Sequence, residues 1–313
     1  MNEKLVSIEH DGVTLEGTLS RPDGDGMAMC VLLIAGSGPL DRNQNSARVQ
    51  LNLFNSIAAK LCEKGIASVR YDKRGCGKST GDFDATGHTE LVGDAARWLS
   101  WMQQLSSLKE TSFYLLGHGE GALIAAQLAA SNPTIDGQIL ISPSVENYAR
   151  VIQRQAEVAL QEISTLRGFK GGLLRFFLRL SGNQIAKQKK LVKRIQQSSG
   201  ATIKIRKQLI NAKWIREMIA LDGPAIFAET TVPTLAIGGA KDLQSLPADV
   251  DTLKTLIRAP LEAHVLPDLT HVLRADEGVA STQHYTRLSL QPVDDRLHEI
   301  IGRWLIDRGQ GNA

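Results

Sequence analysis

Residues Phe113–Ala130 read FYLLGHGEGALIAAQLAA. The first four, Phe113–Leu116, form a short apolar run typical of a buried strand, while Ala122–Ala130 is small, apolar and helix-favouring. Between the two lies Gly117-His118-Gly119-Glu120-Gly121, with three glycines in five residues. Because glycine permits tight turns and close approach of two backbones, the stretch predicts a strand, a sharp turn and a helix.

This stretch resembles the nucleophile elbow, G-x-S-x-G, of the α/β-hydrolases. In that motif the outer glycines let strand and helix approach closely, and the middle residue adopts a strained conformation that lifts its side chain over the sheet. The middle position here is Gly119. The resemblance therefore implies an intact turn whose nucleophilic serine is replaced by glycine.

The same glycines also fit a second motif. Gly117-x-Gly119-x-x-Ala122 after a strand matches the dinucleotide fingerprint G-x-G-x-x-G/A. That fingerprint normally opens the first βαβ unit and is followed about 20 residues later by an acid. Here several strands precede the turn, and the next predicted strand, Gln138–Ile141, ends in Ser142-Pro143-Ser144 without an acid. We therefore expect no cofactor.

The chain before this stretch predicts a hairpin and then a buried strand. Leu5–His10 and Val13–Leu19 roughly alternate apolar and polar residues around Asp11-Gly12, as in a hairpin with a two-residue turn. Met27–Ala35 is continuously apolar, which is typical of a strand buried on both faces of a parallel sheet.

The glycine-containing loop that follows this strand begins Gly36-Ser37-Gly38-Pro39-Leu40-Asp41-Arg42. Its sequence resembles the corresponding loop in a group of bacterial α/β-hydrolase esterases, in which this loop forms half of the oxyanion hole. The resemblance implies that the N–H of Ser37 or Gly38, together with that of Glu120, would bind the oxyanion. We expect Asp41 and Arg42 to order the loop through a charge-assisted pair.

A second recurrent motif of the α/β-hydrolases, D-x-R-G-x-G-x-S, is matched by Asp72–Ser79 after the predicted strand Ile66–Tyr71. We expect it to hold a turn rather than to react. Helical periodicity on either side predicts helices over Val49–Glu63 and Thr89–Gln104.

Two residues near the end of the chain match the remaining hydrolase positions. Asp242 lies in Gly239-Ala240-Lys241-Asp242, just past the predicted strand Pro233–Ile237, where the triad acid stands in that family. His271 follows the predicted last strand, Ala263–Leu266, in the place of the triad histidine. Asp249 and Asp251 are alternative acids, but they fall in a predicted helix and are expected at the surface.

The segment between these parts lacks a sheet pattern. Residues 145–230 show helical patterns, such as Tyr148–Ile163 and Leu173–Leu180, and no strand alternation. We therefore expect one α/β-hydrolase core, 1–144 and 231–313, with a mostly parallel twisted sheet flanked by helices, and a helical cap or lid at 145–230. Glu146–Thr230 carries 16 Lys/Arg and 6 Asp/Glu, a net +10, whereas the rest of the chain is −7. This charge is consistent with a solvated face, an anionic substrate or an anionic membrane surface, and the cap could also form a homodimer.

The amino-acid composition indicates what kind of protein this is. Of the 313 residues 42% are hydrophobic and 22% charged, as in a globular protein. Met1–Lys4 leads into a strand pattern without a secretory apolar region, and no run approaches the ~18 apolar residues of a membrane span. Three scattered cysteines without metal spacing suggest a cytoplasmic protein without a metal, and no nucleic-acid-binding module is recognisable.

The resemblance implies a serine-hydrolase-type carboxylic ester hydrolase acting on a small-molecule ester or related amide, with Asp242, His271 and a nucleophile at position 119. Gly119 leaves two explanations open. Either a serine was deliberately changed to glycine to trap a ligand, so the chain is inactive, or glycine is native. In the second case the protein is a non-catalytic small-molecule binding protein or an atypical enzyme that uses water at this position.

Overall fold

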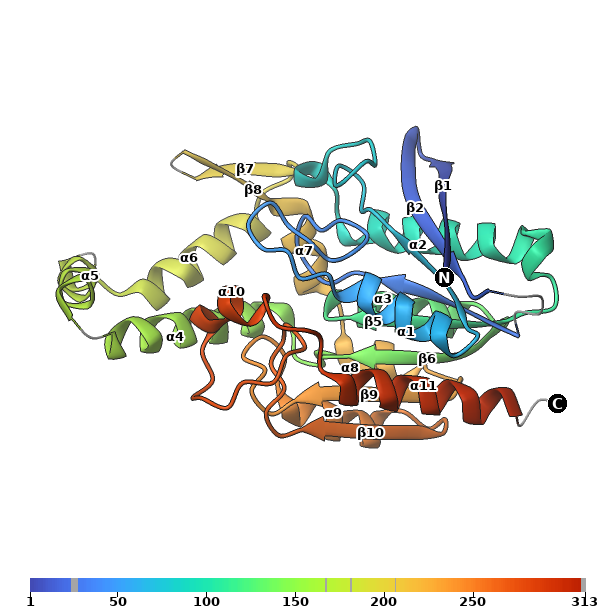
Figure 1. The fold of residues 1–313 in the computed structure, drawn as a ribbon. Coiled ribbons are helices and arrows are strands. Elements are labelled where there is room, and N and C mark those ends of the chain that lie inside the picture. Colours follow the sequence, from blue (N-terminus) through green and yellow to red (C-terminus); the bar gives the residue numbers. More distant parts are fainter. Residues whose placement is uncertain (24–27, 167, 181, 206, 311–313) are drawn as a thin grey trace. The chain divides into compact units, whose positions relative to one another are not determined.

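The computed structural model describes residues 1–23, 28–166, 168–180, 182–205 and 207–310 (Figure 1). The chain divides into two compact units. Unit 1 contains Met1–Phe83, Thr89–Val145 and Gly223–Ala313, and unit 2 contains Asp84–His88 and Glu146–Asp222. The predicted strand start, Met27, lies outside the described residues.

Unit 1 is built on an eight-stranded sheet in the order β1-β2-β4-β3-β5-β6-β9-β10. The strands are β1 Asn2–His10, β2 Val13–Arg21, β3 Met29–Ile34, β4 Ala67–Tyr71, β5 Ser112–His118, β6 Ile135–Ile141, β9 Thr234–Gly239 and β10 Leu261–Leu266. Strand β2 pairs antiparallel with β1 and β4, and the other neighbours are parallel. The predicted mostly parallel sheet is confirmed, and its order differs from the 3-2-1-4-5-6 of dinucleotide-binding sheets.

The local patterns of the sequence account for these strands. All residues of β3, β4 and β9 are buried, and the unbroken apolar character of β3 predicts this for a central strand. Strand β4 is buried although it contains Ser68 and Arg70. The predicted first hairpin is also confirmed, because His10 pairs with Val13 and both turn residues, Asp11 and Gly12, have positive φ.

Seven helices are described in unit 1. They are α1 Leu53–Glu63, α2 His88–Gln104, α3 Glu120–Ser131, α8 Gly223–Ala228, α9 Pro247–Leu256, α10 Tyr285–Leu288 and α11 Asp295–Gln310. Helices α1 and α11 contact each other and share one apolar cluster with β3, β5, β6 and β9. The buried Trp98 of α2 stacks on Tyr71 of β4, with ring centroids 5.7 Å apart.

Unit 2 contains both helices and a hairpin. Its elements are α4 Tyr148–Thr165, α5 Gly168–Leu180, α6 Gln184–Gln196, β7 Thr202–Ile205, β8 Gln208–Asn211 and α7 Ala212–Ala220. The expectation that residues 145–230 contain no strand is therefore wrong, because β7 and β8 pair antiparallel. The unit also ends at Asp222 rather than at 230, with α8 in unit 1. Strands of four residues are too short to give a clear alternation in the sequence.

Two smaller expectations are also corrected. The helix predicted from Val49 begins at Leu53, because Val49 and Leu51 lie in the preceding loop. Asp249, expected at the surface, is buried in the first turn of α9, whereas Asp251 is exposed.

Among the described helices, none has both the length and the apolar character needed to cross a bilayer.

Candidate active site

The turn between β5 and α3 has the tight geometry that its glycines predict. A Cβ on Gly117 would lie 2.0 Å from the Gly121 carbonyl oxygen, and one on Gly121 would lie 2.0 Å from that of Ile34. Both positions therefore require glycine, because strand and helix approach without room for a methyl group. Gly119 adopts φ 57° and ψ −115° as the N-cap of α3, and its N–H donates to the Ile141 carbonyl at 2.9 Å.

Position 119 differs from its two neighbouring glycines because a side chain would fit there. A Cβ on Gly119 would have ordinary contacts, at 3.6 Å from His271 Cε1, 3.8 Å from His271 Nε2 and 3.8 Å from Gly36 Cα. The glycine is thus not required by packing. Its backbone conformation, however, is one that residues with a Cβ rarely adopt.

Asp242, which is buried, and His271 are in hydrogen-bond contact beside this turn. His271 Nδ1 lies 2.9 Å from Asp242 Oδ2, although the two residues are 29 positions apart in the chain. Oδ1 of Asp242 accepts hydrogen bonds from the N–H groups of Gln244 and Ser245 at 2.8 and 2.9 Å. Burial opposes ionisation of Asp242, but His271 and these donors outweigh it and hold the pKa of the carboxyl below its usual value.

This pair leaves His271 Nε2 facing residue 119. With Nδ1 bound to a carboxylate, the imidazole has a fixed orientation, and Nε2 is the nitrogen available to take a proton. A hydroxyl on a Cβ 3.8 Å away can reach the ~2.6–3.2 Å of a hydrogen bond to Nε2. The three residues singled out for the triad positions therefore lie together in unit 1.

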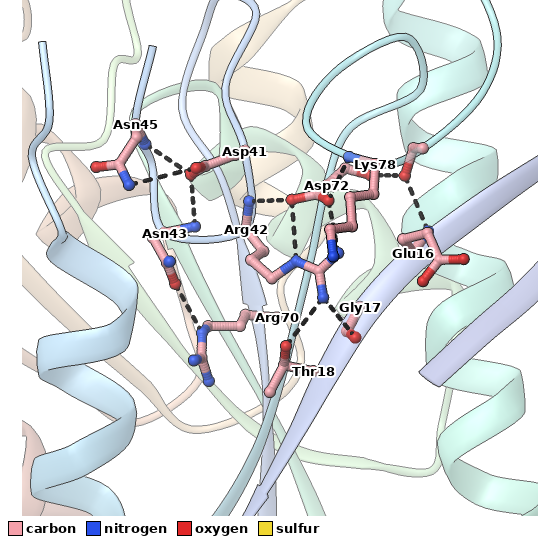
Figure 2. Close-up of polar contacts among 11 residues, drawn as sticks. Glu16, Gly17, Thr18, Asp41, Arg42, Asn43, Asn45, Arg70, Asp72 and Lys78 are labelled. Carbon is pink, nitrogen blue, oxygen red and sulfur yellow. Dashed lines mark hydrogen bonds and ion pairs between the residues drawn. The ribbon is translucent and has the colours of Figure 1, made fainter. Parts of the chain in front are cut away.

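The loop after β3 runs past the same turn, and its order comes from buried polar contacts (Figure 2). Asp41 accepts from the N–H groups of Asn43 and Asn45, both at 2.8 Å. Arg42 does not pair with Asp41 as expected. Its Nε, Nη2 and backbone N–H bind the carboxylate of Asp72 at 3.1, 2.6 and 2.6 Å, so the loop is tied to the D-x-R-G-x-G-x-S turn.

The predicted oxyanion residues lie at two neighbouring places. Ser37 and Gly38 directly follow Gly36, whose Cα is close to position 119, and Gly38 has φ 98°. Glu120 opens α3, and its carboxylate is buried rather than presented to a substrate. Its Oε2 lies 3.3 Å from Nζ of Lys73, which is also buried.

Sequence reasoning missed the role of Lys73. Besides the ion pair with Glu120, its Nζ donates to the carbonyl oxygen of Gly36. In a trans peptide the C=O and the following N–H point in opposite directions, so this contact also fixes the direction of the Ser37 N–H. The only available signal was a lysine at the variable second position of the D-x-R-G-x-G-x-S motif, and that signal does not name a partner.

His118 lies beside His271. Its ring packs against that of His271 with centroids 4.6 Å apart, and its Nε2 lies 3.1 Å from the His271 carbonyl oxygen. Burial and the neighbouring His271 lower its pKa from 6.5 to about 3. Its other ring nitrogen, Nδ1, lies 3.0 Å from Oε1 of Gln44, so a neutral His118 can donate to only one of these two oxygens.

This pKa shift predicts a pH dependence of stability. Between pH 6.5 and about 3 the unfolded chain binds a proton at His118 that the folded chain excludes, so this contribution is present above pH 6.5 and lost as the pH falls. From pH 7 to 5, the parent chain should lose about 2 kcal/mol more unfolding free energy than the His118→Gln variant. Urea unfolding at both pH values measures this difference, and equal losses would contradict it.

The two alternative acids lie outside this group, because Asp249 and Asp251 are in α9. Other histidines have partners of their own, and His264 pairs with Glu262 on the edge strand β10. His284 pairs with Asp276, and His298 lies 3.2 Å from Ser56 Oγ. No group of three or more His, Cys, Asp or Glu in the described ranges is arranged to hold a metal ion.

Comparisons with known proteins concern the family and the fold of the chain. The family model described as serine aminopeptidase, S33, matches residues 50–277. Esterase EstD from Thermotoga maritima is 27% identical over 306 residues, covering 96% of this chain and 68% of that protein.

Solved structures show a similar backbone. Est1E from Butyrivibrio proteoclasticus, with ferulic acid bound, has a TM-score of 0.64 at 16% identity and covers 97% of this chain and 98% of its own. Esterase Pf2001 from Pyrococcus furiosus has a TM-score of 0.57 at 14% identity, with 98% and 92% covered. At these identities the likeness concerns the fold, and it confirms the one predicted from the sequence.

Proposed function

Since the chain belongs to the serine aminopeptidase S33 family of α/β-hydrolases, we propose that its unit 1 carries the site of a serine-type carboxylic ester hydrolase. The observation that supports this most is the position of His271. Its Nδ1 is bound to Asp242 and its Nε2 lies 3.8 Å from where a Cβ of residue 119 would be. Such an arrangement fits general-base activation of a hydroxyl at position 119.

The proposed roles follow the chemistry of acyl transfer. With serine at position 119, His271 would take the hydroxyl proton while the oxygen attacks the ester carbonyl, and would later return the proton to the leaving alcohol. Asp242 would hold the imidazole and stabilise its charged form. The N–H groups of Ser37 or Gly38 and of Glu120 would bind the oxyanion. As the chain stands, Gly119 provides no oxygen for an acyl-enzyme, so we propose that it is catalytically impaired.

The substrate class proposed is a small-molecule ester, as the name of the relative EstD suggests. The three cysteines, Cys30, Cys62 and Cys76, are free and buried, and on this basis we propose a reducing, cytoplasmic setting.

Covalent labelling tests the proposal directly. A fluorophosphonate should modify the Gly119→Ser variant at residue 119 and leave the parent chain unmodified at that position, as read by mass spectrometry of tryptic peptides. The matched control is Gly119→Ala, which adds a Cβ but no hydroxyl. A folded Gly119→Ser variant that does not label would count against the proposed site.

Glycine at position 119 also favours a second candidate, a small-molecule binding protein without turnover on the same scaffold. It predicts that the Gly119→Ser variant folds but neither labels nor hydrolyses esters. The parent chain would then bind an ester or acid ligand that protects it against thermal unfolding.

We expect Lys73 to act as a positioning residue in this reaction. In the Gly119→Ser background, Lys73→Met should lower kcat by roughly 10- to 100-fold with KM nearly unchanged, because the Ser37 N–H loses its fixed direction. Steady-state hydrolysis of p-nitrophenyl butyrate measures both constants.

Two controls accompany this variant. Pairing Lys73→Met with Glu120→Gln avoids leaving a buried carboxylate without its cation. Lys60→Met removes an exposed lysine and should leave kcat unchanged. An increase in KM with unchanged kcat would contradict the positioning role.

A further inference from the structure

Unit 2 contains a long segment of uniform charge. No Asp or Glu occurs between Glu162 and Glu217, whereas 14 Lys and Arg do. Helix α6 carries much of this charge, and its Lys189, Lys190, Lys193 and Arg194 are exposed. A segment without acids cannot neutralise itself, so its face attracts anions.

Helix α5 of the same segment exposes an apolar stripe. Phe169, Leu173, Phe176 and Leu180 are spaced at i, i+4, i+7 and i+11 and therefore share one face of the helix. Their exposed fractions are 85%, 45%, 57% and 69%. Exposed aromatic and aliphatic side chains in one row mark a surface that is suited to an apolar contact.

A groove lies between α6 and the β7–β8 hairpin, with a volume of about 870 Å³. Its apolar lining comes from Leu191, Ile205 and Ile210, and its cationic lining includes Lys190, Arg194 and Lys207. The groove thus combines an apolar surface with positive charge.

We propose that unit 2 docks on the surface of an anionic lipid bilayer. The stripe on α5 enters the boundary between headgroups and acyl chains, while the cations of α6 lie against lipid phosphates. The groove receives the headgroup and upper chain of one anionic lipid. Exposed apolar side chains on one helix and exposed cations on another helix of the same unit supply the two attractions of an interfacial contact, and no helix needs to span the membrane.

Charge favours a bilayer over other occupants. A second copy of this chain would bring one acid-free segment against another, and like charges at an interface cost several kcal/mol. A nucleic acid would pair with the cations but would leave the stripe on α5 in water. An anionic bilayer satisfies both features at once.

Vesicle flotation with the full chain tests the proposal. Vesicles of phosphatidylcholine with about one third phosphatidylglycerol should bind the chain, and vesicles of phosphatidylcholine alone should bind at least about tenfold more weakly. Binding should fall steeply between about 0.1 M and about 0.5 M NaCl. Absence of binding to the anionic vesicles would overturn the proposal.

Two variants separate the contributions of charge and apolar contact. The triple variant Lys189→Glu, Lys190→Glu, Lys193→Glu should weaken vesicle binding roughly a hundredfold, since each cation near the surface is worth about fivefold. Phe169→Gln with Leu180→Gln should weaken it at least about tenfold. The charge-matched control is Lys4→Glu, Lys109→Glu, Arg258→Glu, which reverses three exposed cations of unit 1.

The controls also separate the proposal from its competitors. Vesicle binding that falls equally in the unit 1 control would overturn it, because net charge rather than this surface would then be responsible. Light scattering measures the oligomeric state. A homodimer that the Phe169→Gln, Leu180→Gln variant dissociates would assign the stripe to a second copy instead. Circular dichroism of each variant verifies that it is folded.

Discussion

The Gly119→Ser variant should hydrolyse p-nitrophenyl butyrate at least ~10⁴-fold faster than the parent chain, measured as kcat/KM. The reason is that an acyl-enzyme needs an oxygen at this position, and the groups to activate it are already in place. His271 Nε2 lies 3.8 Å from the Cβ position, and Asp242 holds the opposite ring nitrogen. Without the nucleophile, only the oxyanion donors and binding contribute, which is worth roughly 10³–10⁴ over water.

The same substitution should cost stability. Gly119 has φ 57° and ψ −115°, and a residue with a Cβ pays about 1–3 kcal/mol in such a conformation. Steric contact adds little, because the nearest atom is 3.6 Å away. We therefore expect a lower melting temperature for Gly119→Ser than for the parent, and an equal or higher one would contradict the strain argument.

A double variant provides the control for activity. Gly119→Ser combined with His271→Ala should return to near the rate of the parent chain, since the hydroxyl then lacks its base. If the double variant keeps the rate of the single one, the new activity does not use His271. In that case the proposed site is wrong even though the serine reacts.

Asp72→Ala should lower the unfolding free energy by about 3–5 kcal/mol. Asp72 is buried and accepts three hydrogen bonds from Arg42 and one from the N–H of Lys78 at 2.9 Å (Figure 2). Removing the carboxylate leaves the guanidinium of Arg42 buried beside the Gly17 carbonyl and the Thr18 hydroxyl, without its countercharge. The total unfolding free energy of a domain is only about 5–15 kcal/mol, so this loss is a large fraction of its stability. Urea unfolding measures it.

A second variant should disturb the same contact between Arg42 and Asp72 without changing either residue. A Cβ on Gly77 would lie 2.4 Å from the Asp72 carboxylate, and Gly77 has φ 55°, so Gly77→Ala should also destabilise by displacing that carboxylate. The control is Glu63→Gln, which breaks the exposed pair with Lys60 and should cost less than about 1 kcal/mol. Equal losses of unfolding free energy in Asp72→Ala and Glu63→Gln would show that the buried network contributes no more to stability than an exposed ion pair.

Much of the fold and part of the site could be predicted from local sequence. The apolar run that became β3 is continuous over all six residues, and the glycines around Gly119 identify a turn by their number alone. The order of the motifs along the chain also placed Asp242 after one strand and His271 after the next. Because parallel strands end at the same edge of a sheet, that order already predicted their proximity.

Contacts between distant segments could not be predicted in the same way. Arg42 was expected to bind its neighbour Asp41, but its partner is Asp72, 30 residues away, because both side chains meet inside the core. Lys73 and Gln44 gave no signal in the sequence, although they bind Gly36 and face His118 in the structure. The short strands β7 and β8 were missed for a related reason, since each is stabilised by the other.

The sequence by itself therefore determined most strands, turns and helices of unit 1 and which residues could react, because periodicity and glycine content act over a few neighbouring residues. Only the tertiary structure decided which buried charge meets which, that position 119 has room for a side chain while positions 117 and 121 have none, and that the stripe on α5 remains exposed. These properties depend on desolvation and on packing between segments far apart in the chain, and no local pattern records the distance between such segments.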